Sequence, residues 1–165
     1  MMKKEKLHEA LWFAVSAHAG QFDKAGFPYV LHPIRVSEAV ESDEEKIVAL
    51  LHDVVEDTDV TLAQVYDRFG GQIAQAVLAI TKQEKSGGSE TYREYLDRIR
   101  EEPIAVAVKL ADMADNSRPE RIAGLSVQKQ VRLVAKYARG RHYLLTGEWY
   151  DSNNLDQVIK DGYRR

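Results

Sequence analysis

The chain has 165 residues, of which 26 are acidic and 23 are lysine or arginine, so its formal charge is −3. This near-neutral balance lacks the basic surplus that neutralises the phosphates of a duplex, which disfavours a module that binds duplex nucleic acid. The absence of cysteine excludes disulfides, thiolate nucleophiles and cysteine-ligated metals, so a metal would need histidine and carboxylate ligands.

The apolar segments are too short to suggest a membrane span. The longest stretches without a charged side chain, Leu11 to Phe22 and Gly70 to Thr81, have 12 residues each. The basic N-terminus leads into a charge-bearing segment rather than an apolar stretch with a cleavage site, so we expect no secretion signal. These features predict a cytoplasmic protein that does not contact a membrane.

The apolar residues recur mostly at spacings of three and four, which predicts an all-α fold. We find no internal repeat and no shift in composition, so residues 1–165 are expected to form a single helical domain. About seven or eight helices are expected from this spacing. Their approximate ranges are 4–19, 33–41, 47–55, 61–69, 72–80, 91–100, 103–114 and 126–145.

Local signals mark several helix starts and one loop. Ser42 with Glu45, and Thr61 with Gln64, have the spacing of capping boxes. Residues 21–32 read as a loop before a short helix that begins at a proline. The polar segment 82–90 contains adjacent glycines and is the predicted flexible loop and a candidate lid.

Several common motifs of nucleotide-binding proteins and hydrolases are absent. No two glycines are separated by a single residue and no Gly-Lys-Ser/Thr occurs, which excludes a Rossmann loop and a P-loop. There is no nucleophile elbow of serine hydrolases. His8-Glu9 fails as a zinc-protease motif because the residue four positions after His8 is Trp12.

One dense polar cluster lies in an apolar setting, at residues 50–58. His52, Asp53, Glu56 and Asp57 place four ionisable groups within six positions. On a helix, spacings of three and four bring these groups to one side of the last turn. There the carboxylates repel one another and the helix dipole opposes them, so a bound cation would stabilise the arrangement.

His32 and Asp112 are the candidates for completing a metal site. With His52 and Asp53 they make two nitrogen and two oxygen ligands, which leave two octahedral positions for water and substrate. This mixture suits Mn²⁺ or Fe²⁺, with Zn²⁺ as an alternative and Mg²⁺ less natural. Because such an ion lowers the pKa of a coordinated water, the set predicts metal-assisted hydrolysis of a phosphate ester or anhydride.

Each of these residues also has an ordinary explanation. A single buried histidine is more often a hydrogen-bonded core residue than a ligand, but the joint occurrence of the whole set favours a metal. His18 reads as a packed histidine near the site. Lysines and arginines are by default solvated charges, and this applies to Lys109 and Arg118.

The sequence resembles the HD-domain metal-dependent phosphohydrolases, whose pattern is a histidine, a His-Asp pair and a distant aspartate. More narrowly, it resembles the hydrolase domain of the RelA/SpoT stringent-response family, with matches in unchanged order between about Leu7 and Arg118. The matching segments are Ala17-His18-Ala19-Gly20-Gln21, Lys24-x-Gly26-x-Pro28-Tyr29-x-x-His32-Pro33, His52-Asp53-Val54-Val55-Glu56-Asp57-Thr58, Phe69-Gly70 and Val108-Lys109-Leu110-Ala111-Asp112-x-x-x-Asn116.

The resemblance implies a stand-alone, all-helical hydrolase that uses Mn²⁺ to remove the 3′ pyrophosphate from guanosine 3′,5′-bis(diphosphate), ppGpp. It implies that the catalytic acidic pair is Glu56 and Asp57. The implied metal ligands are His32, His52, Asp53 and Asp112. The candidate substrate-binding residues are Lys24 and Asn116, with Lys109 and Arg118 as further candidates.

Two departures from the family pattern concern the base and ribose side of the pocket. Asp23 stands where the family usually has an arginine beside the base, and Ser117-Arg118-Pro119 replaces Met-Arg-Thr. One rival is therefore an HD-type nucleotidase or phosphohydrolase with another nucleotide substrate. A rival of a different class is a regulatory protein that binds a nucleotide without turning it over. The sequence leaves the oligomeric state open.

Overall fold

The computed structural model of the chain describes residues 3–23, 25–85 and 88–150, and within them nearly all regular structure is helical. Two short strands, β1 (Glu84–Lys85) and β2 (Gly88–Ser89), pair antiparallel. The helices are α1 (Lys3–Ala17), α2 (Leu31–Glu38), α3 (Asp43–Leu51), α4 (Val54–Asp57), α5 (Leu62–Phe69), α6 (Gly71–Ile80), α7 (Tyr92–Arg100), α8 (Pro103–Asn116), α9 (Pro119–Ile122) and α10 (Val127–Thr146).

The predicted capping boxes are present. Ser42 and Thr61 each accept a hydrogen bond from the backbone N–H three residues on, and the side chains of Glu45 and Gln64 bond back to the capping residue. Such a box satisfies two backbone N–H groups that have no partner inside the helix, which fixes where the helix begins. The all-α fold class is confirmed, with the small hairpin as an addition.

The expected continuous helix over 47–55 is wrong. Helix α3 ends at Leu51, and His52 and Asp53 form a turn before α4 begins at Val54. The His52 ring contributes to the break, because its Nδ1 lies 2.7 Å from the carbonyl oxygen of Ala49. In a continued α-helix that carbonyl would accept the backbone N–H of Asp53.

Two further boundaries differ from the expectation. The helix expected over 33–41 is α2 and covers Leu31–Glu38, so His32 lies in its first turn. The segment 82–90, expected to be a flexible loop, holds the β1–β2 hairpin in its described part. Alternation over two residues is too short for a sequence pattern to identify as a strand.

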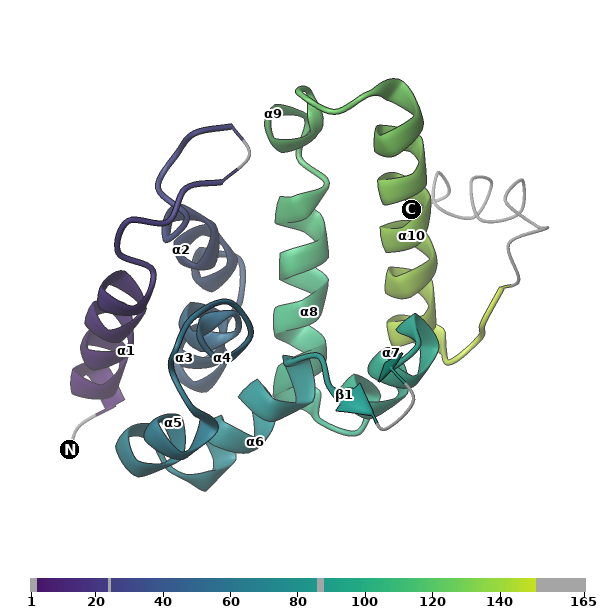
Figure 1. Cartoon of the computed structure of the whole chain (residues 1–165). Helices are drawn as coiled ribbons and strands as arrows, with labels where there is room; N and C mark the ends of the chain where they lie inside the picture. Colours follow the sequence, from purple (N-terminus) through teal and green to yellow (C-terminus); the bar gives the residue numbers. More distant parts are fainter. Residues whose placement is uncertain (1–2, 24, 86–87, 151–165) are drawn as a thin grey trace.

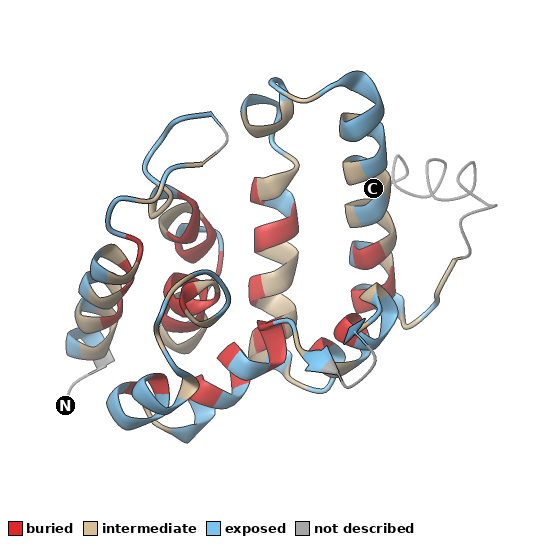
Figure 2. Ribbon diagram, in the orientation of Figure 1, coloured by how far each residue is buried: buried red, intermediate tan, exposed pale blue. Residues whose placement is uncertain are grey.

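Helix α8 occupies a central position and contacts α2, α3, α6, α7 and α10 (Figure 1). The buried faces of these helices turn toward one another, as Figure 2 shows for α3 and α8. Val36 on α2, Val48 and Leu51 on α3, and Val108 on α8 are completely inaccessible to solvent. Full burial of such a side chain contributes roughly 1.5–3 kcal/mol each, so this core fixes α2, α3 and α8 relative to one another.

Helix α10 approaches its neighbours closely at Gly140. A Cβ atom there would collide with the hydroxyl group of Tyr92 on α7 and lie 3.0 Å from Met113 Cε on α8. Glycine therefore permits this packing despite its low helix propensity. The helix expected over 126–145 is α10, and the short helix α9 is an addition. The expectation of one domain to residue 165 extends over 151–165, outside the described residues. Within the described part, no helix has the length and apolar character needed to cross a membrane.

Candidate metal centre

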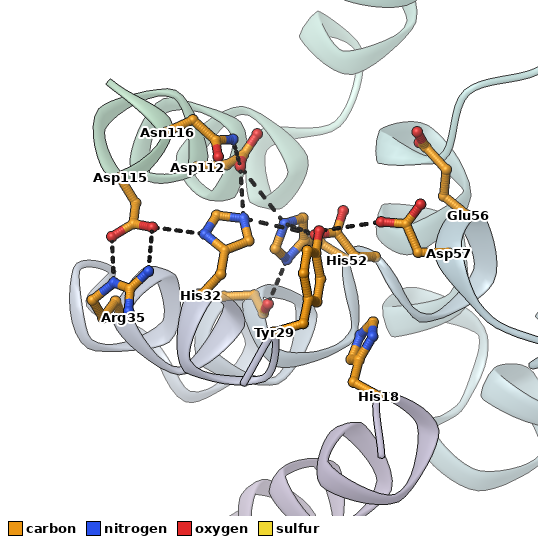
Figure 3. A network of polar contacts seen from close by, with 12 residues as sticks. His18, Tyr29, His32, Arg35, His52, Glu56, Asp57, Asp112, Asp115 and Asn116 are labelled. Atoms are coloured by element: carbon orange, nitrogen blue, oxygen red, sulfur yellow. Dashed lines mark hydrogen bonds and ion pairs between the residues drawn. The ribbon is translucent and has the colours of Figure 1, made fainter. Parts of the chain in front are cut away.

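Four side chains from three parts of the fold converge between α2, α3 and α8 (Figure 3). His32 comes from the first turn of α2, His52 and Asp53 from the turn between α3 and α4, and Asp112 from α8. Three of the four are buried, and the Asp53 side chain is 16% exposed. The core packing of α2, α3 and α8 therefore places all four proposed ligands in one small region.

The ligand atoms of His32, His52 and Asp53 lie close enough to share one ion, and Asp112 lies beside both histidines. His32 Nε2 is 3.1 Å from Asp112 Oδ1 and 3.7 Å from Asp53 Oδ2. His52 Nε2 is 3.0 Å from Asp53 Oδ2 and 3.7 Å from Asp112 Oδ1. One ligand atom from each of His32, His52 and Asp53 lies within 4.8 Å of the others.

The hydrogen bond between His52 and Ala49 leaves the other ring nitrogen of His52 facing this cluster. A carbonyl oxygen only accepts, so the contact to Ala49 assigns the proton to Nδ1 and leaves the lone pair of a neutral ring on Nε2. Nε2 is buried and has no partner in hydrogen-bonding geometry, although Asp53 is 3.0 Å away. A buried nitrogen without a partner beside two carboxylates fits a divalent cation.

The charges around the cluster favour a cation in the same position. Burial would raise the pKa of Asp112, but the Lys109 ammonium and the two histidines hold that pKa well below its usual range. Burial lowers the pKa of His52, yet Asp53 and Asp112 outweigh it and raise the pKa to about 10. The negative charge of these carboxylates helps His52 to retain a second proton. A metal ion bound at the same place would compete with that proton.

Tyr29 was not among the residues selected from the sequence, although it lies in the motif that includes His32. Its hydroxyl donates toward Asp53 Oδ2 at 2.7 Å and toward Asp57 Oδ2 at 3.1 Å. Burial, followed by the charges of Asp53 and Asp57, raises the pKa of Tyr29 far above its ordinary value. The hydroxyl of Tyr29 therefore stays protonated and acts as a hydrogen-bond donor. Its single proton links Asp53, a proposed ligand, to Asp57, a proposed catalytic residue.

The two acidic residues of α4 have different surroundings. Asp57 faces Tyr29, and burial together with the charge of Asp53 raises its pKa, against the opposing hydrogen bond from Tyr29. Glu56 instead binds the ammonium of Lys82 and accepts its backbone N–H at 3.1 Å. Of the predicted catalytic pair, Asp57 is thus the one connected to the metal-site cluster, through the hydroxyl of Tyr29.

His18 is buried against this arrangement, as the sequence suggested. Its ring centroid lies 5.0 Å from that of Tyr29, and its Nδ1 contacts Gln21 Oε1 at 2.8 Å. Gln21 in turn donates to the backbone carbonyl of Asp57 at 2.8 Å. This chain of contacts fixes the end of α4 against the loop that follows α1.

A cavity of about 320 Å³ adjoins the cluster, between the 21–30 loop and helices α8 to α10. Tyr29 and Asn116 belong to both the cavity wall and the polar network, because Asn116 donates to Asp112 Oδ1 at 2.5 Å. The wall combines polar and apolar side chains. Its lining residues are Phe22, Asp23, Ala25, Tyr29, Asn116, Arg121, Ile122, Leu125, Leu133 and Tyr137.

Two other predicted substrate contacts, Lys109 and Arg118, do not line this cavity. Lys109 is nearly buried, with Nζ 2.6 Å from Asp112 Oδ2 and over the ring of Tyr95. Arg118 is half exposed, and its guanidinium lies 3.8 Å from Asp115 and 3.5 Å from Glu120. Lys24 lies outside the described residues. Substrate contact by these three residues stays a prediction.

Asp115 is a second residue that sequence reasoning missed. It lies on α8, three positions after Asp112, and its Oδ2 is 2.7 Å from His32 Nδ1. Burial alone would raise the pKa of Asp115, but hydrogen bonds from His32 and Arg35 hold it well below its usual range. The helical spacing to Asp112 was the available signal, but its partner His32 is 83 positions away in the sequence.

Residues 10–120 match the family model of the HD domain, which is the greater part of the chain. The chain belongs to the HD domain family. The geometry agrees with this membership, because the histidine, the His-Asp pair and the distant aspartate meet at one place.

Relatives of this HD domain carry two different enzyme names. The chain is 33% identical over 162 residues to a guanosine-3′,5′-bis(diphosphate) 3′-pyrophosphohydrolase of Aquifex aeolicus, covering 92% of this chain and 23% of that protein. A probable enzyme of the same name from Synechocystis is 38% identical over 136 residues, covering 76% and 18%. A relative from Myxococcus xanthus, 31% identical over 142 residues, covering 78% and 18%, is named GTP pyrophosphokinase.

A solved structure extends the likeness over almost the whole chain. It is described as a metazoan ortholog of SpoT that hydrolyzes ppGpp and plays a role in starvation responses. The two chains superpose with a TM-score of 0.71 and 27% identity, and the match covers 96% of each. By contrast, this HD domain spans less than a quarter of the length of the curated relatives from Aquifex and Synechocystis.

Proposed function

We propose that this HD domain is a metal-dependent phosphohydrolase that removes the 3′ pyrophosphate from ppGpp. The observation that carries the proposal is the buried cluster of His32, His52, Asp53 and Asp112, with an unpartnered histidine nitrogen directed into it. The names of the Aquifex and Synechocystis relatives, and the description of the metazoan structure, support ppGpp as substrate.

The proposed ligands fit a divalent transition metal, for which we favour Mn²⁺, with Fe²⁺ or Zn²⁺ as alternatives. Two imidazoles and two carboxylates are a mixed nitrogen and oxygen set, which such ions accept more readily than Mg²⁺ does. When bound, an ion of this kind polarises phosphate oxygens and lowers the pKa of a coordinated water. The residues that would hold the ion are His32, His52, Asp53 and Asp112.

In the proposed reaction, Asp57 takes a proton from the attacking water. Its raised pKa suits a general base better than that of an ordinary aspartate does. The water oxygen bonds to the phosphorus next to the ribose 3′ oxygen, and the bond from that phosphorus to the 3′ oxygen breaks. Pyrophosphate and guanosine 5′-diphosphate leave, and the proton held by Asp57 is available to neutralise the departing oxygen. Tyr29 orients Asp57 relative to Asp53 throughout.

The partner of this site is a small anionic nucleotide rather than a duplex nucleic acid. The adjoining cavity has room for a nucleoside, with the aromatic ring of Tyr137 and apolar side chains along its wall. Arg121 and Asn116 line the same cavity and can donate hydrogen bonds. We place the reaction in the cytoplasm.

Asp23 favours a second candidate, an HD-type nucleotidase or phosphohydrolase acting on another nucleotide. The residue lines the cavity, and its negative charge is unfavourable beside a polyphosphate. Non-catalytic nucleotide binding is less favoured, because a purely structural ion has no need of Asp57 beside it.

A nucleotide panel tests these alternatives. Purified protein is incubated with ppGpp, GTP, ATP and pyrimidine nucleotides in the presence of Mn²⁺, Fe²⁺, Zn²⁺ or Mg²⁺, and products are separated by chromatography. We expect pyrophosphate and GDP from ppGpp, no turnover in His52→Ala, and normal turnover in the exposed control His8→Ala. Faster turnover of another nucleotide would establish the second candidate, and binding without product would establish the regulatory one.

A further inference from the structure

Asp115 lies on the side of His32 that faces away from the metal-site cluster. The residue is 6% exposed, and its Oδ2 is 2.7 Å from His32 Nδ1. The other nitrogen of that ring, Nε2, is the atom 3.1 Å from Asp112 Oδ1. Figure 3 shows the imidazole between the two carboxylates, one at each nitrogen. His32 is thus contacted from both sides by aspartates of the same helix, α8.

Two arginines hydrogen-bond to Asp115, and the guanidinium of Arg118 lies 3.8 Å from its Oδ1. Arg35 on α2 makes a bidentate contact, with Nε 2.7 Å from Oδ1 and Nη2 3.0 Å from Oδ2. Arg121 on α9 adds a contact of 2.7 Å to Oδ2. A buried carboxylate between two guanidinium groups is held in its ionised form and in one orientation.

This arrangement determines the proton position on His32. An ionised carboxylate only accepts hydrogen bonds, so Nδ1 must be the donor in the 2.7 Å contact. In the neutral ring, the lone pair is then on Nε2 and faces Asp112 and Asp53. A histidine that donates from one nitrogen to a carboxylate and binds a metal through the other is oriented more firmly, and its ligand nitrogen is more basic.

We propose that Asp115 is a positioning residue that fixes the ring orientation and tautomer of His32 for metal binding. The inference rests on the metal centre in the proposed function, but it is independent of which nucleotide is the substrate. Asp115 does not itself line the substrate cavity, although its partner Arg121 does, and it reaches the cluster only through His32.

His32 depends on a side chain for its orientation, whereas His52 does not. The Nδ1 of His52 contacts the backbone carbonyl of Ala49, three residues earlier in the same segment. The partner of His32 comes instead from a different helix, and its two arginines come from α2 and α9. One side-chain substitution can therefore disturb His32 while leaving the hydrogen bond of His52 intact.

The test measures Mn²⁺ binding to the full chain by calorimetry, without any nucleotide. We expect Asp115→Asn to bind Mn²⁺ about 10–100-fold more weakly than wild type, because the charge that orients His32 is lost. Asp115→Glu retains the charge and should recover part of the affinity. The matched control Asp67→Asn removes an exposed aspartate of α5, an element that supplies no residue of the site, and should bind as wild type does.

A second measurement keeps the test decisive if Asp115→Asn does not fold. The ¹⁵N spectrum of histidine-labelled wild type loaded with Zn²⁺ should show His32 bonded to the metal through Nε2, with a proton on Nδ1. Coordination through Nδ1, or a folded Asp115→Asn with Mn²⁺ affinity equal to that of wild type, would overturn the role of Asp115 alone. A wild-type chain that binds neither ion would overturn the metal centre itself, and the two failures are therefore distinguishable.

Discussion

Four aspartate side chains of the site are chemically identical, but their surroundings suit them to different roles. They are Asp53, Asp57, Asp112 and Asp115. Asp53 and Asp112 face the histidine nitrogens, and Asp115 faces the opposite side of His32. Asp57 faces the tyrosine hydroxyl at the edge of the cluster. Their ability to bind a metal, take a proton or orient a ligand follows from these neighbours rather than from their residue type.

We expect the two acidic residues of α4 to respond unequally to neutralisation. Asp57→Asn removes a proton acceptor with a raised pKa, so kcat should fall roughly 10²- to 10⁴-fold while metal content stays unchanged. Glu56→Gln mainly removes a partner of Lys82, so its kcat should fall less, by about tenfold or below. Steady-state rates and elemental analysis of both variants measure this difference.

The control for this comparison is Asp59→Asn, which neutralises an exposed aspartate just after α4. Its rate should match that of wild type. Equal losses in Asp57→Asn and Glu56→Gln would mean that the acidic pair acts as a unit, and the distinction drawn here from their contacts would be wrong.

Asp23 holds the 21–30 loop in shape. Asp23 Oδ1 accepts the backbone N–H of Ala25 at 2.9 Å and that of Phe27 at 3.0 Å. Phe22 and Pro28 add a β-bridge across the base of the loop. Asp23 therefore has a structural role in addition to its place in the cavity wall.

We expect Asp23→Asn to improve binding of an anionic substrate without loosening the loop. The amide oxygen of asparagine can accept the same two N–H groups, while the negative charge beside the cavity disappears. KM for ppGpp should fall about three- to tenfold with little change in kcat, because the contact lies away from the reacting phosphorus. Rate curves across substrate concentration give both constants.

Two further variants separate charge from loop geometry. Asp23→Ala removes the charge and the acceptor together, so KM should rise or stay level as the loop loses its hydrogen bonds. Asp23→Arg adds a guanidinium group at the cost of the same two hydrogen bonds. An unchanged KM in Asp23→Asn would show that the carboxylate does not sense the substrate.

At the scale of the whole molecule, the proposed ligands come from three segments that are separated in the sequence. His32 on α2, His52 and Asp53 after α3, and Asp112 on α8 span 81 positions of sequence, from 32 to 112. An ion bound by all of them is bound only by the folded chain. Metal binding should therefore stabilise the fold as a whole.

We expect Mn²⁺ at 100 times its dissociation constant to raise the unfolding free energy by about 2.7 kcal/mol. For a chain of this size, that corresponds to an increase in Tm of about 5–10 °C. Thermal melts with Mn²⁺, and after removal of metal by a chelator, measure the shift. His52→Ala and Asp112→Ala should abolish it and lower the metal content below the level of about one ion per chain expected for wild type.

His142→Ala is the control, because this histidine lies on α10 and contacts Thr146 and Glu148 rather than the cluster. It should keep the full shift in Tm. A shift that survives in both ligand variants would mean that Mn²⁺ binds elsewhere on the molecule.

The sequence alone determined the fold class and most helix starts, and it predicted which residue types would form the site. The 3.6-residue periodicity and the capping boxes at Ser42 and Thr61 are local, so they are readable without knowledge of the fold. His52 and Asp53 are adjacent in the chain, and their proximity needed no tertiary structure. The identity of the proposed ligands could accordingly be predicted from residue type and motif.

Only the tertiary structure decided how these groups are partnered. The contact of Asp115 with His32 joins residues 83 positions apart, and the contact of Tyr29 with Asp57 joins residues 28 apart. Such pairs depend on how α2 packs against α8 and on where α3 breaks, which periodicity does not specify. Helical spacing alone made Glu56 and Asp57 equivalent. The packing of the loop and of Lys82 around α4 separated them, because the effect of a carboxylate depends on the groups within a few ångströms of it.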